Sequence, residues 1–204
     1  MKEVTKAKQI WFLVLIGVIV FITVTSISFA ADEYSFVLKW GTIGNGDGQF
    51  VSPTGVAVDS ESNVYVVDSS RNVIQKFKSD GTFITKWGEF GSGDGQFGMP
   101  YSVAVDSNSN DVYVADQTNH RVQKFKSDGT FITKWGSKGS GDGQLFFPLG
   151  VAVDLEGNVY VADYNTRIQK FTSDGDFLAG WRIMASGESI IYPLFRKVFY
   201  RILI

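Results

Sequence analysis

Residues 100–136 read PYSVAVDSNSNDVYVADQTNHRVQKFKSDGTFITKWG, and the same text recurs on both sides of this stretch with few changes. The preceding copy, residues 53–88, reads PTGVAVDSESNVYVVDSSRNVIQKFKSDGTFITKWG. The following copy, residues 148–181, reads PLGVAVDLEGNVYVADYNTRIQKFTSDGDFLAGW. The copies begin at residues 53, 100 and 148, so the period is 47 to 48 residues. A unit of this length cannot bury its own apolar face, so we expect the copies to stack on one another.

Each copy contains four short runs in which apolar and polar residues alternate, as they do in β-strands. In the second copy the expected strands are Ser102–Asp106, Asp111–Ala115, Arg121–Phe125 and Thr130–Trp135. An Asp-Gly pair between the third and fourth runs is typical of a hairpin turn, because glycine accepts a positive φ without steric cost. Four antiparallel strands per copy predict an all-β fold of the β-propeller type, with one copy per blade.

The repeat closely resembles that of the NHL-repeat family. A glycine-rich linker precedes each copy, reading GNGDGQF at 44–50, GSGDGQF at 91–97 and GSGDGQL at 139–145. The motifs P-x-G-V-A-V-D, N-V-Y-V-A-D and N-x-R-I-Q-K-F then follow at nearly fixed offsets, and the Trp-Asp dipeptide of WD40 repeats is absent. The resemblance covers roughly residues 34–181 and implies an NHL-type segment over residues 32–181, with blades at about 50–88, 97–136 and 145–181.

Three blades are fewer than the four to eight that usually close a propeller. Residues 34–41, YSFVLKWG, match the last strand of a copy, so we expect them to form an N-terminal outer strand. Residues 182–204 hold a degenerate fourth linker and an atypical tail. Either the chain is truncated there, or a homodimer closes a six-bladed ring, a number common in the family that the sequence resembles.

Residues 1–31 form a hydrophobic, helical targeting segment. Lys2, Lys6 and Lys8 precede a long apolar run, and Ser28-Phe29-Ala30 is a plausible cleavage site for a signal peptidase. The same run is long enough to serve as an uncleaved transmembrane anchor. Both interpretations place the repeats outside the cytoplasm, secreted or anchored at the cell surface.

Charge and composition limit the classes of partner that the chain can bind. Residues 1–30 contain three lysines and one glutamate, so 16 basic and 20 acidic residues remain after their removal. An exported, mildly acidic domain without a basic cluster is a poor candidate for binding nucleic acid. The chain has no cysteine, which excludes disulfides and thiolate-bound metals.

Strand alternation places the linkers and the loops between second and third strands on one side of the blades. We expect ligand-binding residues on this side, and we rank His120 and Tyr164 above the others because they break the repeat. For most of the remaining candidates, the simpler role is structural: their side chains would form hydrogen bonds that fix their own loops. The candidate residues are Asp68, Arg71, Asp116, Asn119, His120, Arg121, Asp163, Tyr164, Asn165 and Arg167.

We predict no cofactor, no metal site and no catalytic residues. The linkers offer one carboxylate each (Asp47, Asp94 and Asp142), far fewer oxygens than calcium requires. The Asp106–Asp111 loop resembles the start of an EF-hand but lacks its later glycine and glutamate, so a polar hairpin explains it better. His120 is the one histidine of the chain, so it cannot build the multi-histidine zinc site of an amidating lyase that shares the propeller.

The sequence therefore favours a non-catalytic binding module for a protein, a peptide or a surface glycan. Membrane contact would come from the N-terminal segment if it is not cleaved. Two alternatives stay open: the chain is a fragment of a propeller enzyme of the lyase or lactonase type, or it is a truncated product without independent function.

Overall fold

The computed structural model describes residues 36–182, and within them the chain forms three four-stranded antiparallel sheets. All three sheets belong to one compact unit of the chain, which begins at Leu38. Blade 1 contains β3 (Pro53–Val58), β4 (Val64–Asp68), β5 (Val73–Phe77) and β6 (Phe83–Trp87). Blade 2 contains β7 (Pro100–Val105), β8 (Val112–Asp116), β9 (Arg121–Phe125) and β10 (Phe131–Trp135). Blade 3 contains β11 (Pro148–Val153), β12 (Val159–Asp163), β13 (Arg167–Phe171) and β14 (Phe177–Arg182).

The strands within a blade follow one another in sequence order, so each sheet is a simple meander. A short helical turn, η1 (Ser69–Arg71), joins β4 to β5, and a small parallel pair of β1 (Thr42–Ile43) and β2 (Gln49–Phe50) brackets the first linker. The Asp-Gly turns have the expected left-handed glycines, with φ of 84° at Gly81, 91° at Gly129 and 96° at Gly175. The predicted strands of the second copy agree with β7 to β10 within two residues.

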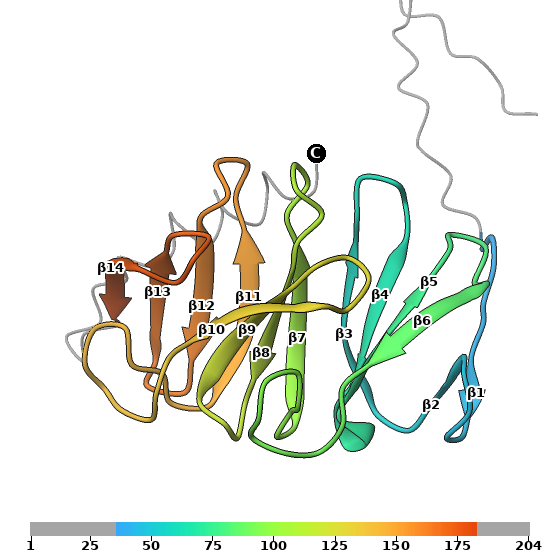
Figure 1. Ribbon diagram of the computed structural model, residues 1–204, viewed down its shortest axis with the longest axis horizontal. Helices are drawn as coiled ribbons and strands as arrows, with labels where there is room; N and C mark the ends of the chain where they lie inside the picture. Colours follow the sequence, from blue (N-terminus) through green and yellow to red (C-terminus); the bar gives the residue numbers. More distant parts are fainter. Residues whose placement is uncertain (1–35, 183–204) are drawn as a thin grey trace, which may run out of the picture. The chain divides into compact units, whose positions relative to one another are not determined.

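The blades stack through their first strands, because β7 lies against both β3 and β11. Figure 1 shows the three sheets side by side, with the linkers and η1 along the lower edge and the β3–β4 and β11–β12 hairpins along the upper edge. One apolar cluster lies between blades 1 and 2, where Tyr65 and Ile74 meet Val103 and Phe125. A second cluster repeats this arrangement between blades 2 and 3. The alanines that the sequence places in each first strand (Ala57, Ala104 and Ala152) lie on these innermost strands.

The segment expected to form an N-terminal outer strand differs from the prediction, because residues 36–41 lie outside any strand. Trp40 nevertheless occupies the place that the repeat assigns to it. Its ring centroid lies 6.1 Å from that of Phe77, as Trp87 lies 5.9 Å from Phe125 and Trp135 lies 5.9 Å from Phe171. A strand needs a hydrogen-bonded neighbour, and none of the described strands pairs with residues 36–41.

The expected hydrophobic helix, the cleavage site and the tail at 183–204 lie outside the described residues. In the part of the chain that the structure describes, no helix has both the length and the apolar character needed to cross a membrane.

Candidate functional site

The predicted site residues lie on the side of the blades that carries the linkers, hereafter the linker face. Three aspartates at the ends of the second strands are buried there, and each accepts hydrogen bonds from linker backbone. Asp68 accepts from the N–H groups of Val51 and Ser52, both at 2.9 Å. Asp116 accepts from the N–H of Gly98 at 2.7 Å, and Asp163 from that of Phe146 at 3.2 Å. These carboxylates therefore hold the end of each linker against its own blade.

One arginine per blade completes this loop structure. Arg121 donates to the carbonyls of Ser92, Gly93 and Gln96 at 2.7 to 2.8 Å, and its Nε lies 2.7 Å from Asp116. Arg167 donates to the equivalent carbonyls of Ser140, Gly141 and Gln144, and its Nε lies 3.0 Å from Asp163.

Arg71 reaches the same three linker positions from a different place in the sequence. It donates to the carbonyls of Asn45, Gly46 and Gln49, although it precedes its third strand by two residues where Arg121 and Arg167 begin theirs. The turn η1, followed by Asn72 in the left-handed region at φ 56°, redirects the side chain. The apparent departure of the first copy from the repeat therefore preserves its contacts.

The two asparagines among the candidates have the same role. Asn119 donates to the carbonyl of Gly91 at 2.8 Å, and Asn165 to that of Gly139 at 3.1 Å. The structure thus brings the aspartate and arginine of each blade, and the asparagine of blades 2 and 3, together around the linker that precedes the blade. It does not gather the candidates of all three blades into one site, and the side chains of the candidate aspartates, arginines and asparagines are engaged in holding loops.

His120 is also held by a loop contact. Its Nδ1 accepts a hydrogen bond of 3.0 Å from the N–H of Phe147, just as the side-chain oxygen of Asn72 accepts one of 2.8 Å from the N–H of Met99. A ring nitrogen that accepts carries no proton, so the neutral imidazole has its proton on Nε2. Burial and the nearby positive charge of Lys138 lower the pKa of His120, and Asp116 opposes them in part.

An aromatic cluster surrounds this histidine: His120, Phe146, Phe147 and Tyr164. The ring of His120 stacks on Phe146 at 5.5 Å and meets Phe147 edge-on at 4.5 Å. Phe147 in turn meets Tyr164 at 6.5 Å, and the ammonium of Lys138 lies 6.0 Å from the ring of Phe146. Tyr164 is 68% exposed, so the cluster opens to solvent at that residue.

Reasoning from the repeat identified His120 and Tyr164 but missed Phe146, Phe147 and Lys138. The missed signal lies in the linker, which ends in Phe146-Phe147-Pro148 where the second copy has Gly98-Met99-Pro100. The aromatic cluster therefore forms where three departures from the repeat meet at the boundary between blades 2 and 3.

The opposite side of the blades carries the hairpins, and its polar groups also bind one another. Asp59 accepts from the backbone and side chain of Asn63 and from the hydroxyl of Tyr65 at 3.0 Å. Asp154 repeats these contacts with Asn158 and Tyr160. The Asp106–Asp111 loop is a turn between β7 and β8, in which Asp106 accepts from the N–H of Asn108.

Two of the three linker carboxylates have lysine partners. Asp47 pairs with Lys86 and Asp94 with Lys134, each at 2.5 Å. Across residues 36–182, no three histidine, aspartate or glutamate side chains are grouped so that they could hold a metal ion.

Comparison with known proteins bears on the fold. The family described as NHL repeat matches residues 50–77 and 97–125. A streptogramin B lyase structure is similar with a TM-score of 0.50 and 20% identity, over 65% of this chain and 41% of that one. A catalytically inactive variant of virginiamycin B lyase from Staphylococcus aureus, with quinupristin, gives a TM-score of 0.53 and 15% identity over 70% of this chain and 43% of that one. Hydrazine synthase from Kuenenia stuttgartiensis is similar with a TM-score of 0.50 and 13% identity, over 67% of this chain and 39% of that one.

This chain therefore spans about two fifths of the length of these structures. At such identities the similarity shows the β-propeller fold and does not transfer an activity. No curated protein sequence matches the chain significantly.

Proposed function

The chain carries NHL repeats that fold as consecutive β-propeller blades, and we propose that it is an extracytoplasmic, non-catalytic binding module. Its ligand would be a protein, a peptide or a surface glycan, held on the linker face by a preformed surface without a covalent step. Export rests on the targeting character of residues 1–31, and the cell-surface or secreted location follows from it.

The observation that carries this proposal is the aromatic cluster. A flat, partly exposed aromatic surface beside a lysine can stack on a sugar ring or on an aromatic side chain, and tyrosine adds a polar group at the rim. The cluster lies on rigid blade ends, so its shape is set before the ligand arrives. The repeated aspartates, arginines and asparagines form hydrogen bonds that hold in place the loops carrying this surface.

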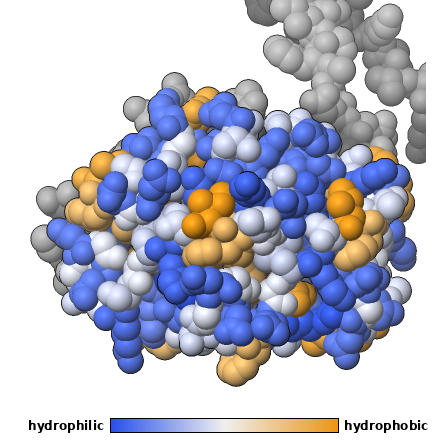
Figure 2. Space-filling model, viewed as in Figure 1, coloured by the Kyte–Doolittle hydropathy of each residue, from blue (hydrophilic) through white to orange (hydrophobic). Residues whose placement is uncertain are grey.

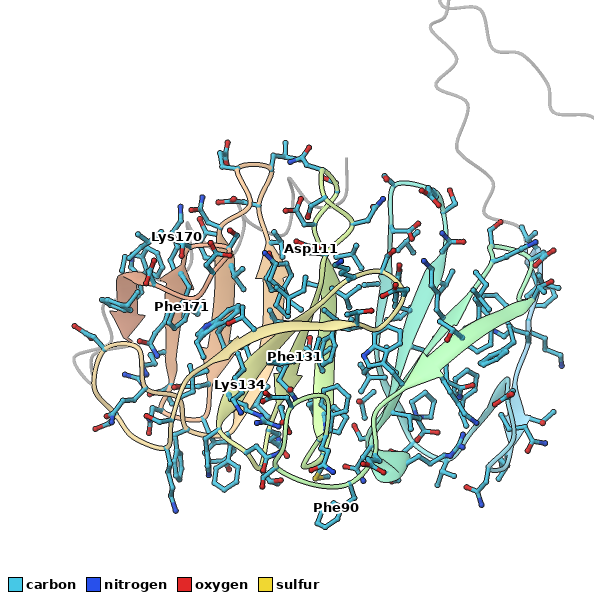
Figure 3. All side chains as sticks on the ribbon, viewed as in Figure 1. Phe90, Asp111, Phe131, Lys134, Lys170 and Phe171 are labelled. Atoms are coloured by element: carbon cyan, nitrogen blue, oxygen red, sulfur yellow. The ribbon has the colours of Figure 1, made fainter. Side chains whose placement is uncertain are left out.

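Other exposed apolar side chains lie on the same face. Ile43 and Phe90 occupy equivalent linker positions in successive blades, and each forms a bridge with the aromatic residue that ends its linker. Figure 3 shows Phe90 projecting from the lower edge, away from the strands. In the view of Figure 2, hydrophilic side chains dominate and hydrophobic ones form small, separate groups. Small apolar contacts in a polar surround are typical of transient recognition surfaces.

The test is a binding screen of the full chain on a glycan array and on a displayed peptide library. For any ligand that binds, Tyr164→Ala should weaken binding by at least ten-fold, since it removes the exposed ring. Leu178→Ala is the matched control, because Leu178 is also exposed but lies on β14 outside the aromatic cluster. Binding that survives Tyr164→Ala unchanged would show that the aromatic cluster is not the recognition surface.

The lyase alternative has its own test. Some similar structures are lyases, and incubation of the full chain with a streptogramin followed by liquid chromatography and tandem mass spectrometry would detect conversion of the substrate, including to a product of the same mass. Turnover would replace the non-catalytic proposal with an enzymatic one.

A further inference from the structure

Every blade has two unlike faces, one turned to the preceding blade and one to the following blade. At the boundary of blades 2 and 3, the face of blade 2 contributes Tyr113, Ala115 and Val122, and that of blade 3 contributes Val151 and Phe171. At the boundary of blades 1 and 2, the same repeat positions meet: Tyr65, Val67 and Ile74 against Val103 and Phe125. The chain thus builds one kind of interface twice.

Both ends of the three-blade arc leave part of this interface uncovered, although Trp40 packs on Phe77 at the outer part of the blade 1 face. Val56 in blade 1 is 66% exposed, whereas the residues at its position in the other blades, Val103 and Val151, are 5% and 9% exposed. Val58, two residues further along the same strand, is exposed as well. Within residues 36–182 nothing covers this part of β3.

Blade 3 also has uncovered apolar residues, on the face that is turned away from blade 2. Tyr160, Ala162 and Ile168 are only partly buried, whereas the matching residues of blades 1 and 2 are fully buried. Trp181 also changes its packing: it stacks on Tyr160 at an interplanar angle of 19°, while Trp87 and Trp135 meet their tyrosines at 74° and 68°. Those two tryptophans contact a phenylalanine of the next blade, which Trp181 lacks among the described residues.

We propose that a second copy of this chain covers both faces, with blade 3 of each copy packed on blade 1 of the other, head to tail. The faces match because each is a repeat of one that already packs inside the chain. Ala162 has the repeat position of Ala115 and Val56 has that of Val151, and Ala115 and Val151 belong to one apolar cluster. An occupant of unrelated sequence would have to reproduce this fit, whereas a second copy has it built in.

Polar contacts between blades fit the same arrangement. Lys76 donates to the carbonyl of Ser127 in blade 2 at 3.2 Å, and Lys124 lies 3.5 Å from Asp174 in blade 3. Lys170 has the corresponding place on blade 3, near the upper edge in Figure 3. Its counterpart groups would be Ser79 and Asp80 of the second copy, which occupy the Ser127 and Asp174 positions in blade 1.

The symmetry of the assembly follows from the pairing of unlike faces. A head-to-tail contact closes into a ring only when the rotation between copies returns to its start. Two arcs of three blades give six, within the range of four to eight found in propellers. Each copy would then make two identical interfaces and leave no open sheet face.

Engineered cysteines test the proposal directly, because the full chain contains none of its own. Val56→Cys and Ala162→Cys are introduced singly, and the two variants are oxidised separately and as a mixture. We expect the mixture to form a disulfide-linked dimer and neither single variant to do so, since Val56 would face Ala162 of the other copy and never itself. Phe90→Cys, exposed on the linker face, reports random collision when it is mixed with either variant.

The absence of linked dimer in the mixture above the Phe90→Cys background would overturn the proposal. Dimers formed by Val56→Cys alone would overturn it as well, because they would show like faces meeting. The result is independent of ligand binding by the aromatic cluster, since the cross-link is read without any ligand.

Discussion

At the scale of residues, the linker face shows how repetition separates structural groups from candidate recognition groups. Asp116 is fully buried and accepts hydrogen bonds from Gly98, Asn119 and Arg121, so all of its capacity serves the loop. A buried carboxylate with a buried arginine beside it contributes little net stability, yet removing one partner leaves the other charge unpaired.

Asp116→Ala should therefore lower the free energy of unfolding by about 3 kcal/mol, because Arg121 loses its buried partner. Urea denaturation followed by tryptophan fluorescence measures the change. Asp94→Ala is the matched control, since Asp94 pairs with Lys134 on the exposed linker and should cost no more than about 0.5 kcal/mol. Equal losses in both variants would contradict the structural role of Asp116.

His120 links stability to pH. Its pKa is lowered in the folded state, chiefly by burial, so the unfolded chain binds a proton more readily than the folded one. The stability that depends on neutral His120 is complete above the unfolded pKa of about 6.5 and is lost as pH falls from there toward the lowered folded value.

His120→Asn should remove this pH dependence while keeping the loop contact, because Asn72 makes the same contact in the first blade. Melting temperatures measured between pH 7.5 and 5 should fall less for the variant than for the original chain. The lowered carboxyl pKa of Asp59 acts below about pH 4, outside this window. Parallel curves for the two proteins would show that His120 does not titrate in that range.

At the scale of elements, the segment containing Trp40 covers the outer part of the free face of blade 1. Trp40 packs closely on Gly81, as Trp87 packs on Gly129. A Cβ atom added to either glycine would lie only 2.8 Å from the tryptophan ring. Trp40 thus fills the position that the last strand of a preceding blade would fill. In a head-to-tail dimer, Trp181 of the second copy would compete with Trp40 for this position.

Trp40→Ala should for this reason raise the yield of the disulfide between the Val56→Cys and Ala162→Cys variants. Trp40→Phe keeps an aromatic ring over Phe77 and should leave the yield closer to its original value. Both are compared at equal protein concentration on non-reducing gels. A lower yield with Trp40→Ala would show that Trp40 supports the contact instead of competing for it.

The elements themselves were largely predictable from the sequence, because alternation and Asp-Gly turns are local signals. Residues 36–41 were not, since their strand character depends on a neighbour that local sequence does not reveal. Two of the four residues of the aromatic cluster were predictable. His120 and Tyr164 lie in loops that align between the copies, so their departure from the repeat is visible in the sequence. Phe146 and Phe147 lie in a linker, where a change of composition looks like ordinary loop variation until the fold brings it beside His120.

At the scale of the whole molecule, the proposed head-to-tail dimer would make the three blades of each copy half of a six-bladed ring. Exposed apolar sheet faces favour association, and a specific partner protects them from non-specific pairing. The linker faces of two copies would then lie on one side of the ring, which would present two aromatic clusters to a multivalent ligand and strengthen its binding.

The most direct measurement is the molar mass of the folded full chain by light scattering, over a range of concentrations and with any bound detergent accounted for. The account predicts a mass twice that of the single chain weighed by mass spectrometry, and a single-chain mass for Val56→Asp. A single-chain mass for the unaltered protein at every concentration, together with a cooperative thermal melt, would contradict it.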